Sequence, residues 1–185
     1  MAFLDRFKRQ SVTPTQHWVE DRSVSLVADF DTFCLCGVAL GDVVEGLGFL
    51  GPAVQAYDFP RKGLVLDVAD SRLEGFCVAL SDAATDLFPM NVQAISAFRG
   101  VIRAGGRDWH PRELAREADF RELWGEPYWR DVDDQEILLF FELRDREIQV
   151  ELTLAGMPKA LIIGKPLLAD PDQRTAYGVT KPWPP

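Results

Sequence analysis

The chain has 185 residues, a formal net charge of −9 at pH 7 and a hydrophobic content of 47%. These figures predict a soluble globular protein with one compact core, and they exclude a disordered tail or a collagen-like repeat. The acidic balance argues against nucleic acid or an anionic membrane as a partner, because both require a cationic surface. It favours a basic protein as the partner.

No stretch approaches the roughly 18 consecutive apolar residues that a membrane span requires, and the first ten residues hold four charged side chains where a secretory signal would be apolar. We therefore expect a cytoplasmic location. Residues 1–29 are predicted to form a short helix, with Phe3, Leu4 and Phe7 on one side, and a connector.

A first unit is predicted over residues 30–105. Apolar side chains between residues 40 and 50 follow helical spacing, and the helix is expected to end at Gly51 and Pro52. The pattern then changes to the alternation that is typical of strands. The strands are expected at residues 57–59, 64–68, 73–80 and 95–103.

A second unit of the same order is predicted over residues 106–165. A helix over 111–124 ends at Gly125 and Pro127, and an acidic turn covers 131–135. The strands are expected at 128–129, 137–142, 147–153 and 160–164. The strand over 147–153 alternates most clearly, which indicates one face in the core and one in water.

The two units correspond at a constant separation of 74 residues, which relates Gly51 to Gly125 and Leu80 to Leu154. One helix with a small meander buries little apolar surface, whereas two joined units share a larger core. We therefore predict an α+β fold in which an antiparallel sheet is built from two tandem helix-plus-meander modules. The last segment, 166–185, is rich in proline and is predicted to be an extended tail.

The three cysteines, Cys34, Cys36 and Cys77, are expected to be reduced thiols, because their number is odd. A zinc site with Cys77 as the third ligand is the alternative, but the paired C-x-x-C spacing of such sites is missing. No metal or cofactor is predicted.

Residues 123–136 combine aromatic and acidic side chains, and they are the candidate site for a partner protein. Trp, Tyr and Arg dominate interface hot spots, and an acidic rim steers cationic partners. A solvated acidic hairpin is the alternative interpretation. The candidate contact residues are Trp124, Glu126, Tyr128, Trp129, Asp131, Asp133 and Asp134.

An enzymatic alternative uses Glu126, Asp108 and His110 as acid and base groups of a hydrolase. Asp108 lies two residues from His110, where its charge would raise the pKa of the imidazole. Nucleophile and phosphate-binding motifs are missing. Gly46, Gly48 and Gly51 match the spacing G-x-G-x-x-G, but they lie inside or at the end of a helical pattern and not between a strand and a helix. We therefore predict no catalytic residue, and the enzymatic interpretation stays the alternative.

The repeated order of a helix, a Gly-x-Pro or Gly-Pro stop and a meander rests on Leu50-Gly51-Pro52 and Trp124-Gly125-Glu126-Pro127. It resembles the tandem arrangement of the beta-lactamase inhibitor protein and the single module of the small outer-membrane assembly lipoproteins. A small acidic chain of this kind also looks like the immunity proteins that bacteria make against toxins. The resemblance implies a protein that blocks the active site of a basic toxin domain; a structural or regulatory interaction protein is a further alternative.

Overall fold

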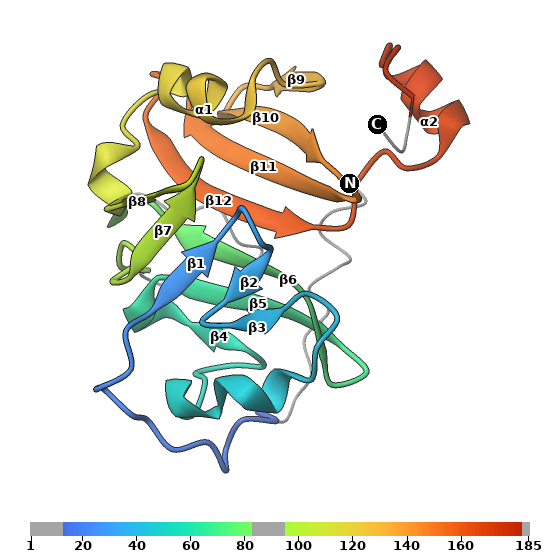
Figure 1. The fold of residues 1–185 in the computed structure, drawn as a ribbon. Helices are drawn as coiled ribbons and strands as arrows, with labels where there is room; N and C mark the ends of the chain where they lie inside the picture. Colours follow the sequence, from blue (N-terminus) through green and yellow to red (C-terminus); the bar gives the residue numbers. More distant parts are fainter. Residues whose placement is uncertain (1–12, 83–94, 183–185) are drawn as a thin grey trace.

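The computed structural model describes residues 13–82 and 95–182. The helix expected within residues 1–10 lies outside these ranges. The chain is a mixed α+β protein made mostly of sheet, with two sheets in which nearly all strand pairs are antiparallel (Figure 1). Within the described residues, no helix is both long enough and apolar enough to cross a membrane.

The larger sheet has seven strands in the order β4-β5-β6-β12-β11-β10-β9. β6 pairs with β12, so that one meander from each half of the chain enters a single sheet. The strands are β4 (Asp58–Phe59), β5 (Leu64–Ala69), β6 (Arg72–Ala79), β9 (Trp129–Val132), β10 (Glu136–Leu143), β11 (Arg146–Thr153) and β12 (Pro158–Gly164).

The smaller sheet has five short strands in the order β3-β2-β1-β7-β8. β1 and β7 run parallel, and Val27, Ala28 and Asp29 pair with the residues 74 positions later. The strands are β1 (Val27–Asp29), β2 (Cys34–Leu35), β3 (Val38–Ala39), β7 (Val101–Ala104) and β8 (Arg107–Trp109). The helices are α1 (Glu117–Trp124), α2 (Pro171–Ala176) and the 3-10 helices η2 (Val44–Leu50), η3 (Pro60–Lys62) and η5 (Pro111–Glu113).

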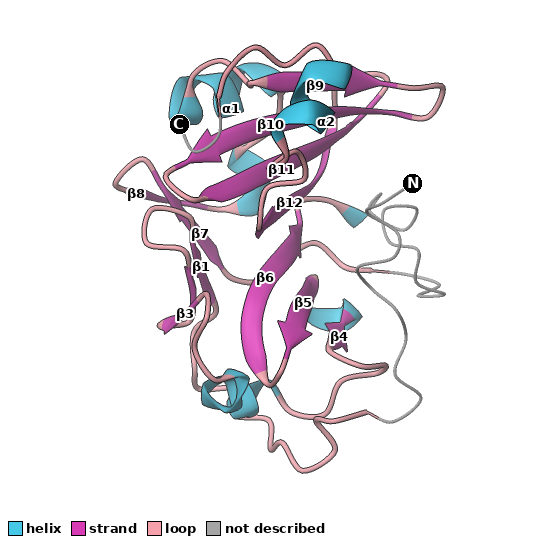
Figure 2. Cartoon of the chain, turned by 90° about the vertical axis from the view of Figure 1, so that its right-hand side faces the viewer, coloured by secondary structure: helices cyan, strands magenta, loops and turns pink. Residues whose placement is uncertain are grey.

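The core lies between the two sheets, which face each other in Figure 2. Ile148, Val150 and Leu152 alternate along β11 and are fully buried, as their spacing predicts. Phe30 of the smaller sheet meets Phe76 of the larger one, with ring centroids 5.6 Å apart. Burying such a side chain stabilises the fold by about 1.5–3 kcal/mol, and this contact joins the two layers.

The opposite face of β11 differs from the expectation of a solvent-exposed side. Glu147, Gln149 and Glu151 are all at most 5% exposed. At one end the cause is visible, because the backbone N–H of Leu167 donates to the Glu147 carboxylate at 3.2 Å. The C-terminal segment therefore packs across this end of the sheet.

Both expected helices are shorter than the sequence indicates. The first is a 3-10 helix that begins only at Val44; Gly46 and Gly48, which weaken an α-helix, lie within it. The second is divided into η5 and α1, because Leu114 leaves the helical conformation with ψ of 81° and is buried in the core. In both segments the hydrophobic spacing correctly indicates helical structure, but tertiary packing decides the type and length of the helix.

Two other segments also differ from the prediction. The strand expected over 95–103 begins only at Val101. At Gly100, just before it, the chain approaches its neighbour so closely that a Cβ would lie 2.4 Å from the Leu26 carbonyl oxygen. The tail is not extended throughout: α2 begins after Asp170, whose carboxylate accepts the N–H groups of Asp172 and Gln173.

Candidate protein-binding surface

Most of the candidate contact residues lie on or beside β9, the last strand of the larger sheet (Figure 1). Within residues 13–82 and 95–182, β9 pairs with β10 on one side only, with Phe140 opposite Trp129 and Ile137 opposite Val132. An edge strand presents unpaired backbone N–H and C=O groups, which can add a strand from another chain. The acidic turn expected over 131–135 is therefore partly strand, because Asp131 and Val132 belong to β9.

Four carboxylates surround this edge, and we call them the acidic β9 surface. The Glu126 side chain is 79% exposed and forms an ion pair with Arg121. Asp131, Asp133 and Asp134 are exposed. The backbone N–H groups of Gln135 and Glu136 donate to Asp133 at 2.8 and 2.9 Å, and these bonds lower its pKa. Asp133 therefore closes the turn and keeps its negative charge.

The two predicted aromatic residues at this edge, Tyr128 and Trp129, are half-buried. The Trp129 ring stacks on Phe140 with centroids 4.6 Å apart, and it also meets Tyr177 at 5.2 Å. The Tyr177 side chain is exposed. One face of the Trp129 ring is therefore used within the protein, and the C-terminal segment adds Tyr177 to the surface.

Tyr128 anchors the C-terminal segment. Its hydroxyl donates to Glu147, and the Arg174 guanidinium lies 4.8 Å from its ring centroid. Burial, and next the negative charge of Glu147, raise the pKa of Tyr128 well above its ordinary value. The Arg174 side chain, 3% exposed, also forms an ion pair with the buried Glu142 carboxylate. Tyr128 therefore belongs mainly to the internal structure.

Trp124 lies further inside the protein than the other candidates. Its ring contacts Phe120, Phe30 and Phe141 with centroids 5.6–6.1 Å apart. These rings belong to the core cluster. Trp124 therefore attaches α1 to the core, and a partner would reach only its uncovered edge.

The residues that the sequence analysis missed are Tyr177 and Val132, whose side chains are 58% and 49% exposed. Val132 could have been found, because it stands between Asp131 and Asp133 in the acidic stretch. Tyr177 could not, because only the folded chain brings it next to Trp129.

No family model, curated protein or solved structure matches this chain.

The residues of the enzymatic alternative have different surroundings. Asp108 forms a bidentate ion pair with Arg103, at 2.7 and 3.2 Å, and Glu126 pairs with Arg121. Only His110 lines the cavity described below. The structure therefore does not gather the three groups around that cavity.

The cysteines do not form a cluster. Cys34 lies in the smaller sheet, whereas Cys77 is buried in the larger one. Cys36 follows β2 with a φ of 50°, so that the strand does not continue from Cys34 through Cys36. Among residues 13–82 and 95–182, no group of three or more His, Cys, Asp or Glu is placed to hold a metal ion.

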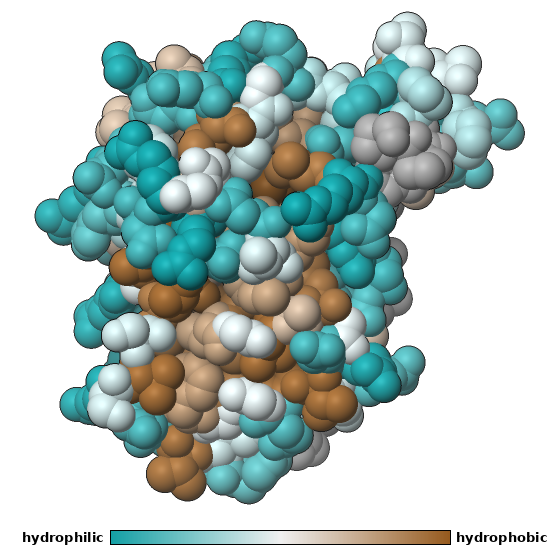
Figure 3. All heavy atoms as spheres, viewed as in Figure 1, coloured by the Kyte–Doolittle hydropathy of each residue, from teal (hydrophilic) through white to brown (hydrophobic). Residues whose placement is uncertain are grey.

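The outer face of the smaller sheet is partly apolar. Figure 3 shows hydrophobic side chains gathered over β1, β2 and β3, while the upper half of the same view is mostly hydrophilic. Val27 and Val101 are adjacent on β1 and β7, and both are half-buried. This face is the one on which an apolar segment of an assembly would pack under the structural or regulatory alternative.

Proposed function

We propose that this chain is a protein-binding module that binds a basic partner through the acidic β9 surface. The observation that carries the proposal is the exposure of Glu126, Asp131, Asp133 and Asp134 around an open sheet edge. Such an edge offers backbone hydrogen bonds, and the carboxylates select a cationic partner and speed its approach. Trp129 and Tyr177 supply aromatic contact area beside the charges.

In its specific form, the proposal is an immunity protein that neutralises a bacterial toxin by covering the toxin's active site. The net charge of −9 supports it, because toxins that act on nucleic acids or on other anionic substrates are commonly basic. Such an inhibitor would act in the cytoplasm.

We further propose that the fold consists of two tandem modules, which are related by 74 residues. Three observations support this relationship. The β1–β7 pairs differ by 74 positions, and so do the bounds of β6 and β11. Gly51 and Gly125, which end η2 and α1, have φ angles of 78° and 79°. In a tandem fold of this kind, β9 is the outer edge strand of the second module.

The experiment is a protection assay with the product of the gene that lies beside this one in its genome. We expect the chain to form a stable complex with that product and to restore growth of cells that express it. Failure to form a complex, together with failure to protect, would remove the toxin interpretation. A complex without protection would leave a binding module and contradict the immunity role.

A matched pair of variants locates the binding surface. The triple substitution Glu126→Gln, Asp131→Asn and Asp134→Asn removes three charges and keeps the Asp133 turn. The control Asp70→Asn, Asp145→Asn and Asp172→Asn removes three exposed charges elsewhere. We expect only the first triple variant to lose protection. Equal loss in both variants would show that net charge alone matters.

A further inference from the structure

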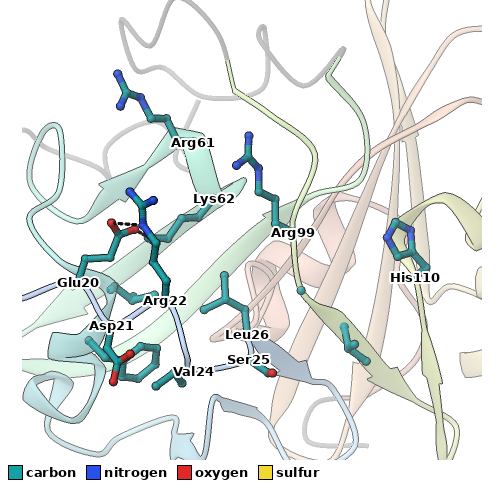
Figure 4. A pocket seen from close by; sticks show the side chains of 14 residues that line it. Glu20, Asp21, Arg22, Val24, Ser25, Leu26, Arg61, Lys62, Arg99 and His110 are labelled. Carbon is teal, nitrogen blue, oxygen red and sulfur yellow. Dashed lines mark hydrogen bonds and ion pairs between the residues drawn. The ribbon is translucent and has the colours of Figure 1, made fainter.

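A second candidate site lies away from β9. A cavity of about 710 Å³ is formed by the segment before β1, the end of η2, η3, the start of β7 and His110 (Figure 4). Its volume lies within the range of roughly 300–1,000 Å³ that is typical of small-molecule sites. The lining comes from five separate parts of the chain, so that the cavity exists only in the folded protein.

One part of the cavity wall is apolar. Val24, Leu26 and Phe49 contribute aliphatic and aromatic surface to it. Figure 4 shows Val24 and Leu26 below the guanidinium groups of Arg61 and Arg99. A ligand with a hydrophobic body can therefore be accommodated beside its charged groups.

The charge of the lining is opposite to the charge of the whole protein. Arg22, Arg61, Lys62 and Arg99 line the cavity, together with two carboxylates, Glu20 and Asp21. The lining therefore carries more positive than negative groups, in a chain whose net charge is −9. Such a concentration of positive charge attracts an anion into a concave site.

Both carboxylates already have partners. Glu20 accepts from Lys62 at 2.5 Å and from Arg22 at 3.0 Å. Asp21 accepts from the backbone N–H and the hydroxyl of Ser23 at 2.9 and 2.7 Å. Neither carboxylate is thus committed to Arg61 or Arg99.

Arg61 and Arg99 lack a partner within the described part of the chain. Every other lysine or arginine of residues 13–82 and 95–182 except Arg112 has an ion pair, a side-chain hydrogen bond or an aromatic ring contact. Two of the three unpaired cations thus line one cavity. Figure 4 shows both guanidinium groups extending toward the same side.

The backbone that carries these two arginines is held closely. A Cβ on Gly63 would lie 2.5 Å from the Phe98 nitrogen, and one on Gly100 would lie 2.4 Å from the Leu26 carbonyl oxygen. The Arg99 N–H donates to the Lys62 carbonyl at 3.4 Å. The two cationic segments are therefore fixed next to each other before any ligand arrives, which reduces the ordering cost of binding.

We propose that this cavity binds a small organic anion, whose carboxylate or phosphate group is held by Arg61 and Arg99 and whose apolar body packs on Val24, Leu26 and Phe49. Planar guanidinium groups match the geometry of both oxyanions. His110 lies on another part of the wall and offers a ring nitrogen to a polar group of the ligand. This site is independent of the acidic β9 surface.

The test is a calorimetric and NMR titration of the full chain with three probes: phenyl phosphate, benzoate and inorganic phosphate. We expect saturable binding of at least one organic probe, with shifts at residues 20–26, 61–62 and 99–101. The organic probe with the higher affinity shows whether the site prefers a phosphate or a carboxylate. Weaker binding of inorganic phosphate than of phenyl phosphate would confirm a role for the apolar wall. Absence of saturable binding by both organic probes would overturn the proposal.

The variant Arg61→Gln/Arg99→Gln tests the assignment of the two cations. Because charge-assisted hydrogen bonds are the strong ones, we expect the affinity to fall about tenfold or more. Arg112→Gln, which removes the third unpaired cation, is the control and should bind as the native chain does. If the double variant does not fold, Val24→Trp should block the cavity while leaving the arginines in place. Unchanged binding in a folded double variant would contradict the site.

Discussion

Gly51 and Gly125, 74 positions apart, end two helices with nearly the same backbone conformation. Their φ angles are 78° and 79°, and their ψ angles are −173° and −153°. Residues with a Cβ almost never combine a positive φ with an extended ψ, and this combination therefore favours glycine at both positions. The repeated conformation at a constant separation is what two tandem modules would produce.

Alanine at either position should destabilise the protein, but to different extents. For Gly125→Ala we expect a loss of about 1–3 kcal/mol from the backbone conformation alone, because nothing lies within 4 Å of the added Cβ. For Gly51→Ala we expect a larger loss, because that Cβ would lie 2.8 Å from the Glu20 Cβ. Urea denaturation measures both. Equal stability of the two variants and the native chain would contradict the assigned conformations.

A second prediction concerns the junction of the two meanders in the larger sheet. A Cβ on Gly75 would lie 2.4 Å from the Ile163 carbonyl oxygen of β12, so that Gly75→Ala should push β6 and β12 apart. We expect a loss of about 1–3 kcal/mol in the free energy of unfolding. Gly48→Ala is the matched control, because its Cβ meets only Trp18 at 3.8 Å. A harmless Gly75→Ala substitution would argue against this strand pairing.

The third prediction is a pH dependence that arises from Glu151 on β11. Burial raises the pKa of this carboxyl from 4.5 to about 8, and the neighbouring Glu136 adds to the effect. The folded state thus keeps a proton that the unfolded state has released, and this contribution to stability is lost as the pH rises from about 4.5 to about 8. The slope is at most about 1.4 kcal/mol per pH unit.

The substitution Glu151→Gln should remove that slope and stabilise the protein above pH 8, because the amide carries no charge to bury. Thermal unfolding at a series of pH values measures it. Glu122→Gln, at an exposed position of α1, is the control and should leave the slope unchanged. If Glu151→Gln and the native chain have the same pH profile, Glu151 is not the titrating group.

A fourth prediction concerns the attachment of the C-terminal segment. Arg174 pairs with buried Glu142 and donates to the carbonyls of Leu168 and Lys181 at 2.9 and 2.7 Å. Arg174→Ala would leave buried groups without partners, and we expect a loss of about 3–5 kcal/mol. Proteolysis should then begin within residues 165–182. Arg112→Ala, which removes an exposed side chain, should change neither measurement.

The long strands of the larger sheet could be predicted from local pattern alone. The expected strand over 147–153 corresponds to Arg146–Thr153, and the one over 73–80 to Arg72–Ala79. Alternation over six to eight residues is a strong signal. Strands of two or three residues, such as Cys34–Leu35, carry no period, so the smaller sheet and its parallel β1–β7 pair were not foreseen.

The exposed carboxylates of the candidate surface could also be predicted from the local sequence. The carboxylates Asp131 and Asp134 are exposed, as polar residues near a turn are expected to be. Trp124 is packed against core rings, because the face of a helix that meets the core depends on where that helix docks. The cavity with Arg61 and Arg99 could not be predicted, because it assembles from segments far apart in the sequence.

The most direct test of the proposed function is the association rate between the chain and the product of the neighbouring gene, measured over a range of ionic strength. For the native chain we predict fast association that slows steeply with added salt. Glu126→Gln/Asp131→Asn/Asp134→Asn should associate about tenfold more slowly at low salt and respond weakly to salt. The same rate and salt dependence for both proteins would contradict binding at the acidic β9 surface.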